Sequence, residues 1–296
     1  MTTTIAPSSP TVETPAAEAT PPPRRRRPPA VPLHLVLIVG LIVMVTPFVW
    51  MILGSFKTTG ELRQTPPTWI PENATLDNFR DLFDRLDFPR FFFNSTLVAM
   101  TVTVGNLLFA SMAGYAFAKL EFPGKRVLFV LVLSTLMIPG VVLFMPQFVL
   151  ISNLGLANTH AALILPFLAG AFGVFLMRQY MLGIPDELLD AARIDGAGEY
   201  TIFFRIVLPL CGPALATLAV LTFVGSWNSF LWPLVAATTE DMYTLPVALA
   251  LFATGQQESN LALQLAGATV VVLPMIILFF VMQRYVIQGV ARTGIK

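Results

Sequence analysis

The chain has 296 residues, of which 55% are hydrophobic and only 12% charged, and its formal net charge is +1. The mean hydropathy of +0.74 lies far above the balance of a soluble globular domain. This composition excludes that class and indicates an integral membrane protein, with lipid and no nucleic acid among its partners. The single cysteine, Cys211, excludes an intramolecular disulfide bond and a metal site built from several cysteines.

The N-terminal segment, residues 1–32, is rich in Pro, Thr, Ala and Glu and has no apolar periodicity. Such a segment buries too little surface to offset the entropy of ordering, so we expect a disordered cytoplasmic tail. Arg24–Arg27 precede the first apolar run, as in a secretory signal peptide, but the run is too long and lacks a small-residue cleavage site. We therefore expect a retained first helix, and residues 33–296 to form one transmembrane domain.

Six apolar runs follow, each close to the roughly 20 residues that a helix needs to cross a hydrocarbon core. They span about residues 33–53, 91–118, 127–151, 161–177, 208–237 and 261–281. With the N-terminus inside, the external side holds only Lys57, Arg63, Arg80, Arg85 and Arg90 of the 18 Lys and Arg residues. Because short cytoplasmic segments retain positive charge, we expect an all-α protein with six transmembrane helices and both termini in the cytoplasm.

The longest external segment lies between the first two runs, at residues 54–90. Its prolines and Trp69 suggest an ordered cap over the outer mouth. We expect Asp77 to begin a short helix there, with Leu82 and Phe83 facing inward. The alternative is a simple connector.

Prolines interrupt most of the later runs, and each removes a helical hydrogen bond that lipid does not replace. A packing kink explains any one of them, whereas all of them together favour a pathway through the protein. They are Pro139, Pro146, Pro166, Pro209, Pro213, Pro233 and Pro274. The polar residues at membrane depth include Asn106 and Gln147, and none is ionisable, which argues against a proton- or sodium-coupled carrier.

A polar segment, residues 185–209, lies between the fourth and fifth runs. Pro185 suits the first position of a helix, and Asp186 and Glu187 place negative charge in its first turn. Gly196 is able to end this helix in the left-handed conformation. We therefore expect one short helix on the cytoplasmic side.

The flank of this short helix suits close contact with another protein. The small side chains of Ala191 and Ala192 let another protein's surface approach the backbone closely. Leu188 and Ala192 lie one turn apart on a shared face. The segment therefore predicts a docking helix. The alternative is a generic amphipathic linker between two spans.

Amides, hydroxyls and aromatic rings gather between Phe223 and Leu234. Rings stack on the C–H faces of sugars while Asn and Ser exchange hydrogen bonds with hydroxyls, so this combination suits an uncharged polyol. The alternative for Trp227 and Trp232 is an aromatic belt at the membrane interface. The residues that we expect along a translocation pathway are Gln147, Ser226, Trp227 and Asn228.

The polar segment resembles the cytoplasmic loop of permease subunits in ATP-binding-cassette (ABC) importers. In that family the loop reads Glu-Ala-Ala, three residues, Gly, nine residues, then Ile-x-Leu-Pro. Here the pattern appears with aspartate in place of the glutamate, which keeps the charge on a shorter arm. The matching loop residues, to which the resemblance assigns coupling with an ATPase, are Asp190, Ala191, Ala192, Arg193, Asp195, Gly196, Ile206, Leu208 and Pro209.

Further blocks along residues 31–296 look like the MalG-type branch of carbohydrate importer permeases. They are Asn94-Ser95, Ala113–Ala116, Phe122–Gly124, Ile138-Pro139, Leu154–Leu156, Asn158-Thr159, Phe175-Leu176, Arg178-Gln179, Trp227-Asn228 and Phe230–Pro233.

The resemblance implies the type I ABC importer permease fold in a bacterial cytoplasmic membrane. It also implies a MalF-like second permease, two ATPase subunits that bind ATP and Mg, and an external sugar-binding protein. ATP hydrolysis is not expected in this chain, because Gly124-Lys125-Arg126 lacks the other elements of a phosphate-binding loop. No cofactor, metal or catalytic residue is expected either, because the apolar runs hold no Ser-His, Asp-Asp or metal-ligand set.

The expected function is therefore a permease subunit for a sugar or oligosaccharide. One alternative is a type I ABC permease for a glycerophosphodiester, another polyol or a peptide. A stand-alone secondary carrier is a further alternative, and it predicts transport by the purified chain without partners or ATP.

Overall fold

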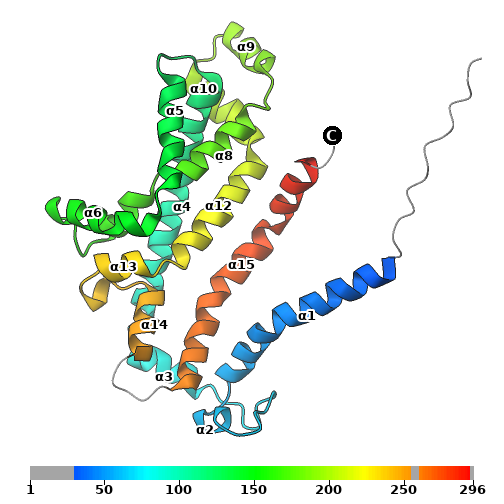
Figure 1. Ribbon diagram of the computed structural model, residues 1–296, viewed down its shortest axis with the longest axis vertical. Helices are drawn as coiled ribbons and strands as arrows, with labels where there is room; N and C mark the ends of the chain where they lie inside the picture. The colour runs from blue at the N-terminus through cyan, green and yellow to red at the C-terminus, as the bar shows by residue number, and fades with distance from the viewer. Residues whose placement is uncertain (1–29, 255–259, 294–296) are drawn as a thin grey trace, which may run out of the picture. The chain divides into compact units, whose positions relative to one another are not determined.

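The computed structural model describes residues 30–254 and 260–293, and every secondary-structure element in those ranges is helical (Figure 1). The all-α prediction is thus confirmed for this part of the chain. The chain divides into two compact units, Met1–Pro47 and Phe48–Lys296.

The helices are, in chain order, α1 (Ala30–Ser55), α2 (Thr59–Leu62), α3 (Asp77–Arg85), α4 (Phe88–Lys119), α5 (Lys125–Ser134), η1 (Thr135–Met137), α6 (Gly140–Asn153), α7 (His160–Ile164), η2 (Leu165–Phe167), α8 (Ala171–Met181), α9 (Asp186–Ile194), α10 (Glu199–Ile202), η3 (Phe203–Val207), α11 (Leu208–Leu210), α12 (Gly212–Trp227), α13 (Leu231–Ala236), η4 (Glu240–Met242), α14 (Leu245–Thr254) and α15 (Leu261–Thr293).

The described part of the first unit belongs to α1, which begins at Ala30 and runs through Pro47 to Ser55. The predicted first span, 33–53, lies inside this helix. Residues 1–29 of the predicted tail lie outside the described residues.

Three unbroken helices are long and apolar enough to cross a membrane: His34–Ser55, Phe88–Lys119 and Leu261–Val281. Three further stretches pass the same test only as bent pairs of helices. The structure therefore offers three crossings, or six if each bent pair crosses once. Six crossings, and cytoplasmic termini, remain predictions.

The bends lie where proline interrupts the helical hydrogen bonds. The third predicted span, 127–151, is two helical stretches that meet at 104°, Lys125–Met137 and Gly140–Asn153. Ile138 precedes Pro139 and is extended, at φ −87° and ψ 118°, because a proline ring disfavours the helical region for the residue before it. The interruption predicted at Pro139 is therefore present, although the sequence did not give its angle.

The fourth and fifth predicted spans are also divided. His160–Phe167 and Ala171–Met181 meet at 41°, and Glu199–Leu210 and Gly212–Trp227 meet at 79°. The fifth prediction, 208–237, further combined α12 with a separate helix, α13. Interruptions were predicted at the prolines of this range, whereas the backbone also leaves the helix at Asn228 and resumes at Leu231.

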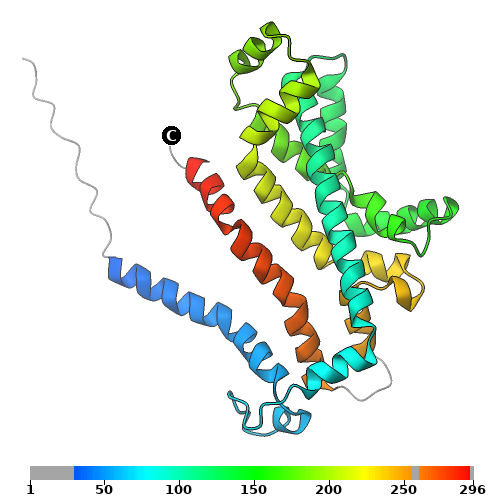
Figure 2. The same cartoon turned by 180° about the vertical axis from the view of Figure 1, so that it is seen from behind.

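Helix α4 is the central helix of the second unit, and it packs against α8 and α12. A side chain at Gly114 would place its Cβ 2.8 Å from the Cβ of Met177 and 2.9 Å from the backbone nitrogen of Arg178, so glycine permits the close approach of α8. Figure 2 shows α4 running from α3 at one end of this unit to the loop that carries α9 at the other.

The segment between α1 and α4 is ordered by buried polar contacts. Lys57 and Glu61 form an ion pair of 3.7 Å with both side chains almost fully buried. The Asn78 amide donates to the carbonyls of Ser55 and Lys57, at 2.9 and 2.8 Å. An ordered fold, rather than a simple connector, is therefore present.

The short helix predicted in this segment is confirmed as α3, which begins at Asp77. Leu82 is fully buried, as expected, whereas Phe83 is 47% exposed. The inward direction predicted for Phe83 was wrong, because neighbouring positions on a helix point about 100° apart and Leu82 occupies the inner face.

Candidate functional site

Helix α9 forms a short projection together with α10, at one end of the second unit (Figure 1). Asp186 and Glu187 lie in its first turn, where they complement the positive end of the helix dipole. Pro185 precedes the helix with an extended backbone at φ −60° and ψ 135°. It is thus the N-cap, one position earlier than predicted, since the φ that its ring imposes fits both places.

The C-terminus of α9 confirms the prediction for Gly196, whose φ is +85°. Its backbone N–H donates to the carbonyl of Arg193 at 3.0 Å, and that of Ala197 donates to the carbonyl of Ala192 at 2.9 Å. This pair of bonds is the Schellman motif, which satisfies the last carbonyls of a helix and favours glycine at the left-handed position. The path of the backbone after α9 is therefore fixed by these two hydrogen bonds.

The two faces of α9 differ from the prediction. Leu189 is buried, and Ala192 packs partly buried against the same core. Leu188 is 43% exposed and Ile194 is 86% exposed. Leu188 and Ala192 therefore do not form one exposed surface, because Ala192 lies on the side of the helix that Leu189 packs against the core. The exposed apolar positions are Leu188, Ala191 and Ile194, which we call the outer face of α9.

Ion pairs hold both ends of α9. The Lys119 ammonium lies 2.6 Å from Asp186 Oδ1 and keeps the pKa of that carboxyl below its ordinary value by hydrogen bonding and charge. Arg193 Nη1 lies 2.8 Å from Asp190 Oδ1, and Arg193 Nε lies 2.9 Å from Glu199 Oε1. These carboxylates raise the pKa of Arg193. Asp190 thus pairs within its own helix, over the short reach of an aspartate.

The remaining predicted loop residues lie in different elements. Asp195 is the C-cap of α9, with φ −74° and ψ 2°. Ile206 lies in the π-helical turn η3, and Leu208 and Pro209 lie in α11. The structure therefore brings Asp190, Arg193 and Gly196 together and places the Ile-x-Leu-Pro part at the entry to α12.

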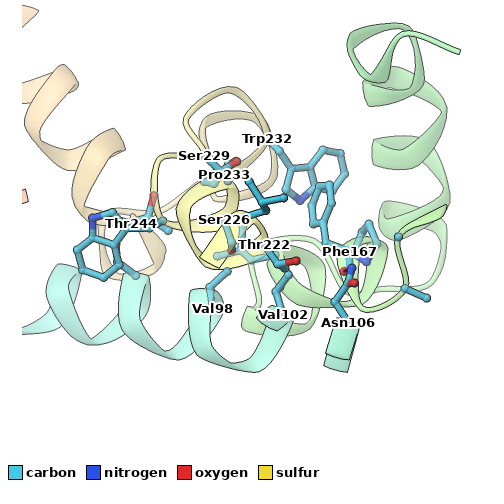
Figure 3. A pocket seen from close by; sticks show the side chains of 18 residues that line it. Val98, Val102, Asn106, Phe167, Thr222, Ser226, Ser229, Trp232, Pro233 and Thr244 are labelled. Carbon is cyan, nitrogen blue, oxygen red and sulfur yellow. Dashed lines mark hydrogen bonds between the residues drawn. The ribbon is translucent and has the colours of Figure 1, made fainter. Parts of the chain in front are cut away.

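A cavity of about 280 Å³ lies among α4, the α7–η2 stretch, α12 and α13 (Figure 3). We call it the central cavity. The residues that line it are Ser95, Val98, Val102, Asn106, Leu163, Pro166, Phe167, Ala169, Gly170, Leu221, Thr222, Gly225, Ser226, Trp227, Ser229, Trp232, Pro233 and Thr244. Of the predicted pathway residues, this set contains Ser226 and Trp227. It does not contain Gln147, on α6, or Asn228, whose amide donates to the Val224 carbonyl at 3.1 Å.

Two buried polar atoms belong to residues of the central cavity and lack a partner. Asn106 is 7% exposed and Thr244 4% exposed. Within the described part of the chain, Asn106 Oδ1 and Thr244 Oγ1 accept and donate no hydrogen bond. Buried polar atoms are normally paired, so these two are exceptions among the residues of the cavity wall. Sequence reasoning recognised Asn106 as polar at membrane depth but did not assign it to the pathway, and it missed Thr244.

The two tryptophans of the cavity are anchored in the core. Trp227 Nε1 donates to the carbonyl of Val271, and Trp232 Nε1 donates to the carbonyl of Ala162, each at 3.0 Å. Both rings are almost completely buried. An aromatic belt at the membrane surface is therefore the wrong explanation for them. Both residues border the central cavity, and their N–H groups are already used within the core.

No group of three or more His, Cys, Asp or Glu side chains in residues 30–254 and 260–293 is able to hold a metal ion. The arrangement instead combines a projecting helix with an apolar outer face and an uncharged cavity beside the same long helix, α4.

Comparison with known proteins identifies relatives over most of the chain. Residues 106–292 match the family described as "Binding-protein-dependent transport system inner membrane component". The chain is 45% identical over 257 residues to the arabinooligosaccharides transport system permease protein AraQ of Halalkalibacterium halodurans, covering 86% of this chain and 92% of the relative. It is 35% identical to the lactose transport system permease protein LacG of Rhizobium radiobacter, covering 82% and 88%.

A solved structure shares the fold. It is a chain of a bacterial ABC transporter involved in the import of the acidic polysaccharide alginate, with a TM-score of 0.77 and 23% identity over 86% of this chain and 95% of that chain. The predicted type I importer permease fold is confirmed by this likeness. The chain belongs to the family of binding-protein-dependent transport system inner membrane components.

Proposed function

We propose that the chain is the permease subunit of a binding-protein-dependent ABC importer in the bacterial cytoplasmic membrane, and that its cargo is a sugar or oligosaccharide. The names of the two relatives given above support this cargo, since they are named for the transport of arabinooligosaccharides and lactose, whereas a relative of 31% identity is named for sn-glycerol-3-phosphate. The observation that carries the proposal is the chemistry of the central cavity.

No residue that lines the central cavity is charged. Its polar groups are the amide of Asn106 and serine and threonine hydroxyls, and its aromatic walls come from Phe167, Trp227 and Trp232. A neutral polyol exchanges hydrogen bonds with the former and stacks its C–H faces on the latter. A buried anion would need a paired cation, so the cavity favours a sugar over a glycerophosphodiester.

Uptake against a gradient needs work, which we assign to partner subunits. Two ATPases bind ATP and Mg, a MalF-like permease completes the pathway, and an external binding protein delivers the sugar. The chain crosses the membrane six times with both termini in the cytoplasm, and it carries no cofactor of its own.

We assign ATPase docking to the outer face of α9 and to the loop residues around it. Ile194 is 86% exposed, and Tyr200, in α10 of the same loop, is 77% exposed. Large apolar side chains exposed on a short polar helix favour burial in another protein's cleft. The ion pairs of Asp190, Arg193 and Asp186 keep the helix in one orientation for this contact.

The test is reconstitution of the complete importer with its second permease, ATPases and binding protein. Arabinooligosaccharides, lactose, a glycerophosphodiester and a peptide are offered outside liposomes loaded with ATP. We expect uptake of a neutral saccharide that requires both ATP and the binding protein. Transport by this chain alone without ATP would instead show a secondary carrier, and selective uptake of the phosphodiester or peptide would contradict the sugar assignment.

A matched pair of variants tests the cavity. Asn106→Leu replaces the amide by an apolar side chain of similar size and should reduce sugar uptake by about tenfold, the effect of one hydrogen bond at about 1.4 kcal/mol. Thr103→Val is the control, because Thr103 is buried on the same helix, donates to the Ala99 carbonyl and does not line the cavity. Equal uptake by the two variants would contradict a role of the cavity.

A further inference from the structure

The C-terminal end of α4 contacts the N-terminal end of α9 directly. The Lys119 ammonium lies 2.6 Å from both the Ile184 carbonyl and Asp186 Oδ1, and its side chain is almost fully buried. Lys119 is the last residue of α4, whereas Ile184 and Asp186 lie at the start of the projecting loop. The first attachment therefore joins the end of a long helix to the beginning of a short one.

The second attachment reaches the other end of α9 through one carboxylate. The Tyr115 hydroxyl donates to Glu199 Oε2 at 2.5 Å, although 84 residues separate them. The other oxygen, Oε1, accepts a hydrogen bond from Arg193 Nε at 2.9 Å. Glu199 thus joins α4 to the last turn of α9.

The two attachments lie on one face of α4. Tyr115 and Lys119 are four residues apart, so their side chains point in nearly the same direction. We call the Lys119–Asp186 contact and the Tyr115–Glu199–Arg193 contact the two-point clamp. Holding both ends of α9 prevents it from pivoting on α4, which a single contact would allow.

The same helix forms a wall of the central cavity. Asn106 lies nine positions before Tyr115 on α4, about 14 Å at 1.5 Å per residue. Helix α4 has 32 residues without a break. An unbroken helix transmits a displacement along its axis, because its hydrogen bonds keep its length constant.

The chain itself connects α9 to the cavity in two directions. From the N-terminal end of α9 it passes through α8 and reaches Ala169 and Gly170, which line the cavity. From the C-terminal end it passes through the π-helical turn η3 and then a 79° bend near Cys211 before it reaches α12. The clamp adds a connection through α4, which is one helix without a break.

We propose that the two-point clamp makes α9 and α4 move as one body, so that displacement of α9 by the ATPases reaches the central cavity through α4. Glu199 is the positioning residue of this connection, because its two carboxylate oxygens bond one residue of each helix, Tyr115 of α4 and Arg193 of α9. The inference rests on the proposed function, in which α9 docks on an ATPase.

Two conservative variants break the clamp at Glu199. Tyr115→Phe removes only the hydroxyl and keeps the ring, whose centroid lies 5.4 Å from that of Phe203. Glu199→Gln keeps the shape and removes the charge. Tyr180→Phe is the matched control, because the Tyr180 hydroxyl makes no hydrogen bond within the described ranges.

The first measurement is the amount of sugar imported per ATP hydrolysed by the complete importer. Both clamp variants should assemble and hydrolyse ATP at close to the wild-type rate, while sugar imported per ATP falls by about fivefold or more, the lower end of usual coupling between sites. Tyr180→Phe should match the wild type. An unchanged ratio in the clamp variants would overturn the proposal.

A merely structural role gives another result. If the hydroxyl and carboxylate only maintain the fold, transport and ATP hydrolysis should fall together and the ratio should stay constant, which would overturn the proposal. Loss of assembly in the conservative Tyr115→Phe variant would equally assign the contact to folding.

The second measurement needs no sugar. Hydrogen exchange is followed in residues 184–199 and 116–124 of the complex, with and without the ATP analogue AMP-PNP. In the wild type both segments should respond. In Glu199→Gln, which keeps the Lys119–Asp186 contact, the response of residues 116–124 should be smaller while that of residues 184–199 is unchanged. A response of residues 116–124 as large in the variant as in the wild type overturns the clamp alone. No response of residues 184–199 in the wild type contradicts ATPase docking, and with it the clamp.

Discussion

Replacing Gly196 by alanine should weaken docking of the ATPase without removing any contact. The backbone at Gly196 has φ +85°, and no atom lies within 4 Å of the position that a Cβ would take. The effect of a methyl group there is therefore conformational strain and not collision. The strain falls on the residue that ends α9 and shapes the loop after it.

The magnitude follows from the left-handed region. An L-residue other than glycine loses about 1–2 kcal/mol in that conformation. If the ATPase binds only the observed loop, this strain appears as about a five- to thirtyfold weaker affinity, since 1.4 kcal/mol is a factor of ten. Asparagine tolerates the conformation better than alanine, so Gly196→Asn should retain more affinity than Gly196→Ala.

The matched control lies two residues away in the same loop. Gly198 has φ −72° and ψ 160°, a backbone that any residue adopts, and its Cβ position is also open. Gly198→Ala should therefore bind the ATPase as the wild type does. The assay is the affinity of purified ATPase for the permease pair in lipid nanodiscs. Equal losses in both alanine variants, or none at Gly196, would refute the argument from backbone strain.

Three further predictions concern stability. Asn106→Leu should raise the free energy of unfolding by about 1 kcal/mol, measured by denaturant unfolding in detergent, because it removes an unpaired buried oxygen and only a long hydrogen bond, 3.5 Å from Asn106 Nδ2 to the Phe167 carbonyl; a decrease would contradict that reading. Gly114→Ala should lower it by about 1–3 kcal/mol through overpacking, whereas Gly140→Ala, with no atom nearby, should not; equal effects would contradict close α4–α8 packing. Because Lys119 lowers the folded-state pKa of Asp186, its stabilisation is present above the ordinary aspartate pKa of about 3.9 and lost as the pH falls through the lower folded value. Hydrogen exchange at the start of α9 in the wild type and Asp186→Asn should thus differ at neutral pH and converge in acid, and a constant difference would contradict the prediction.

Features that depend on one residue's backbone preference were predictable. Gly196 occupies the left-handed position because glycine adopts it at the least steric expense, and Asp77 begins α3 as expected. The apolar runs likewise correspond to helices, since their composition follows from the solvent that surrounds them. The prolines in the long apolar runs predicted interruptions but not their angles, so the 104° angle of the bend after Ile138 was not predicted.

The side-chain partners were not predictable. Glu199 contacts Tyr115 across 84 residues of sequence, and Lys119 reaches Asp186 across 67. The residues next to each partner in the sequence give no sign of a contact with a residue so far along the chain. The outward direction predicted for Ala192 failed for the same reason, because the core beneath α9 decides which side of a short helix is buried.

The order of residues by itself determined that the chain is a membrane protein, that a short capped helix interrupts its apolar runs, and that its motif resembles an importer loop. These properties depend on composition and on neighbours within a few positions. Only the tertiary structure decided that Trp227 and Trp232 are buried, that Asn106 and Thr244 each keep an unpaired oxygen, and that α4 holds both ends of α9. Those outcomes require segments far apart along the chain to meet, and packing among helices selects which of them do.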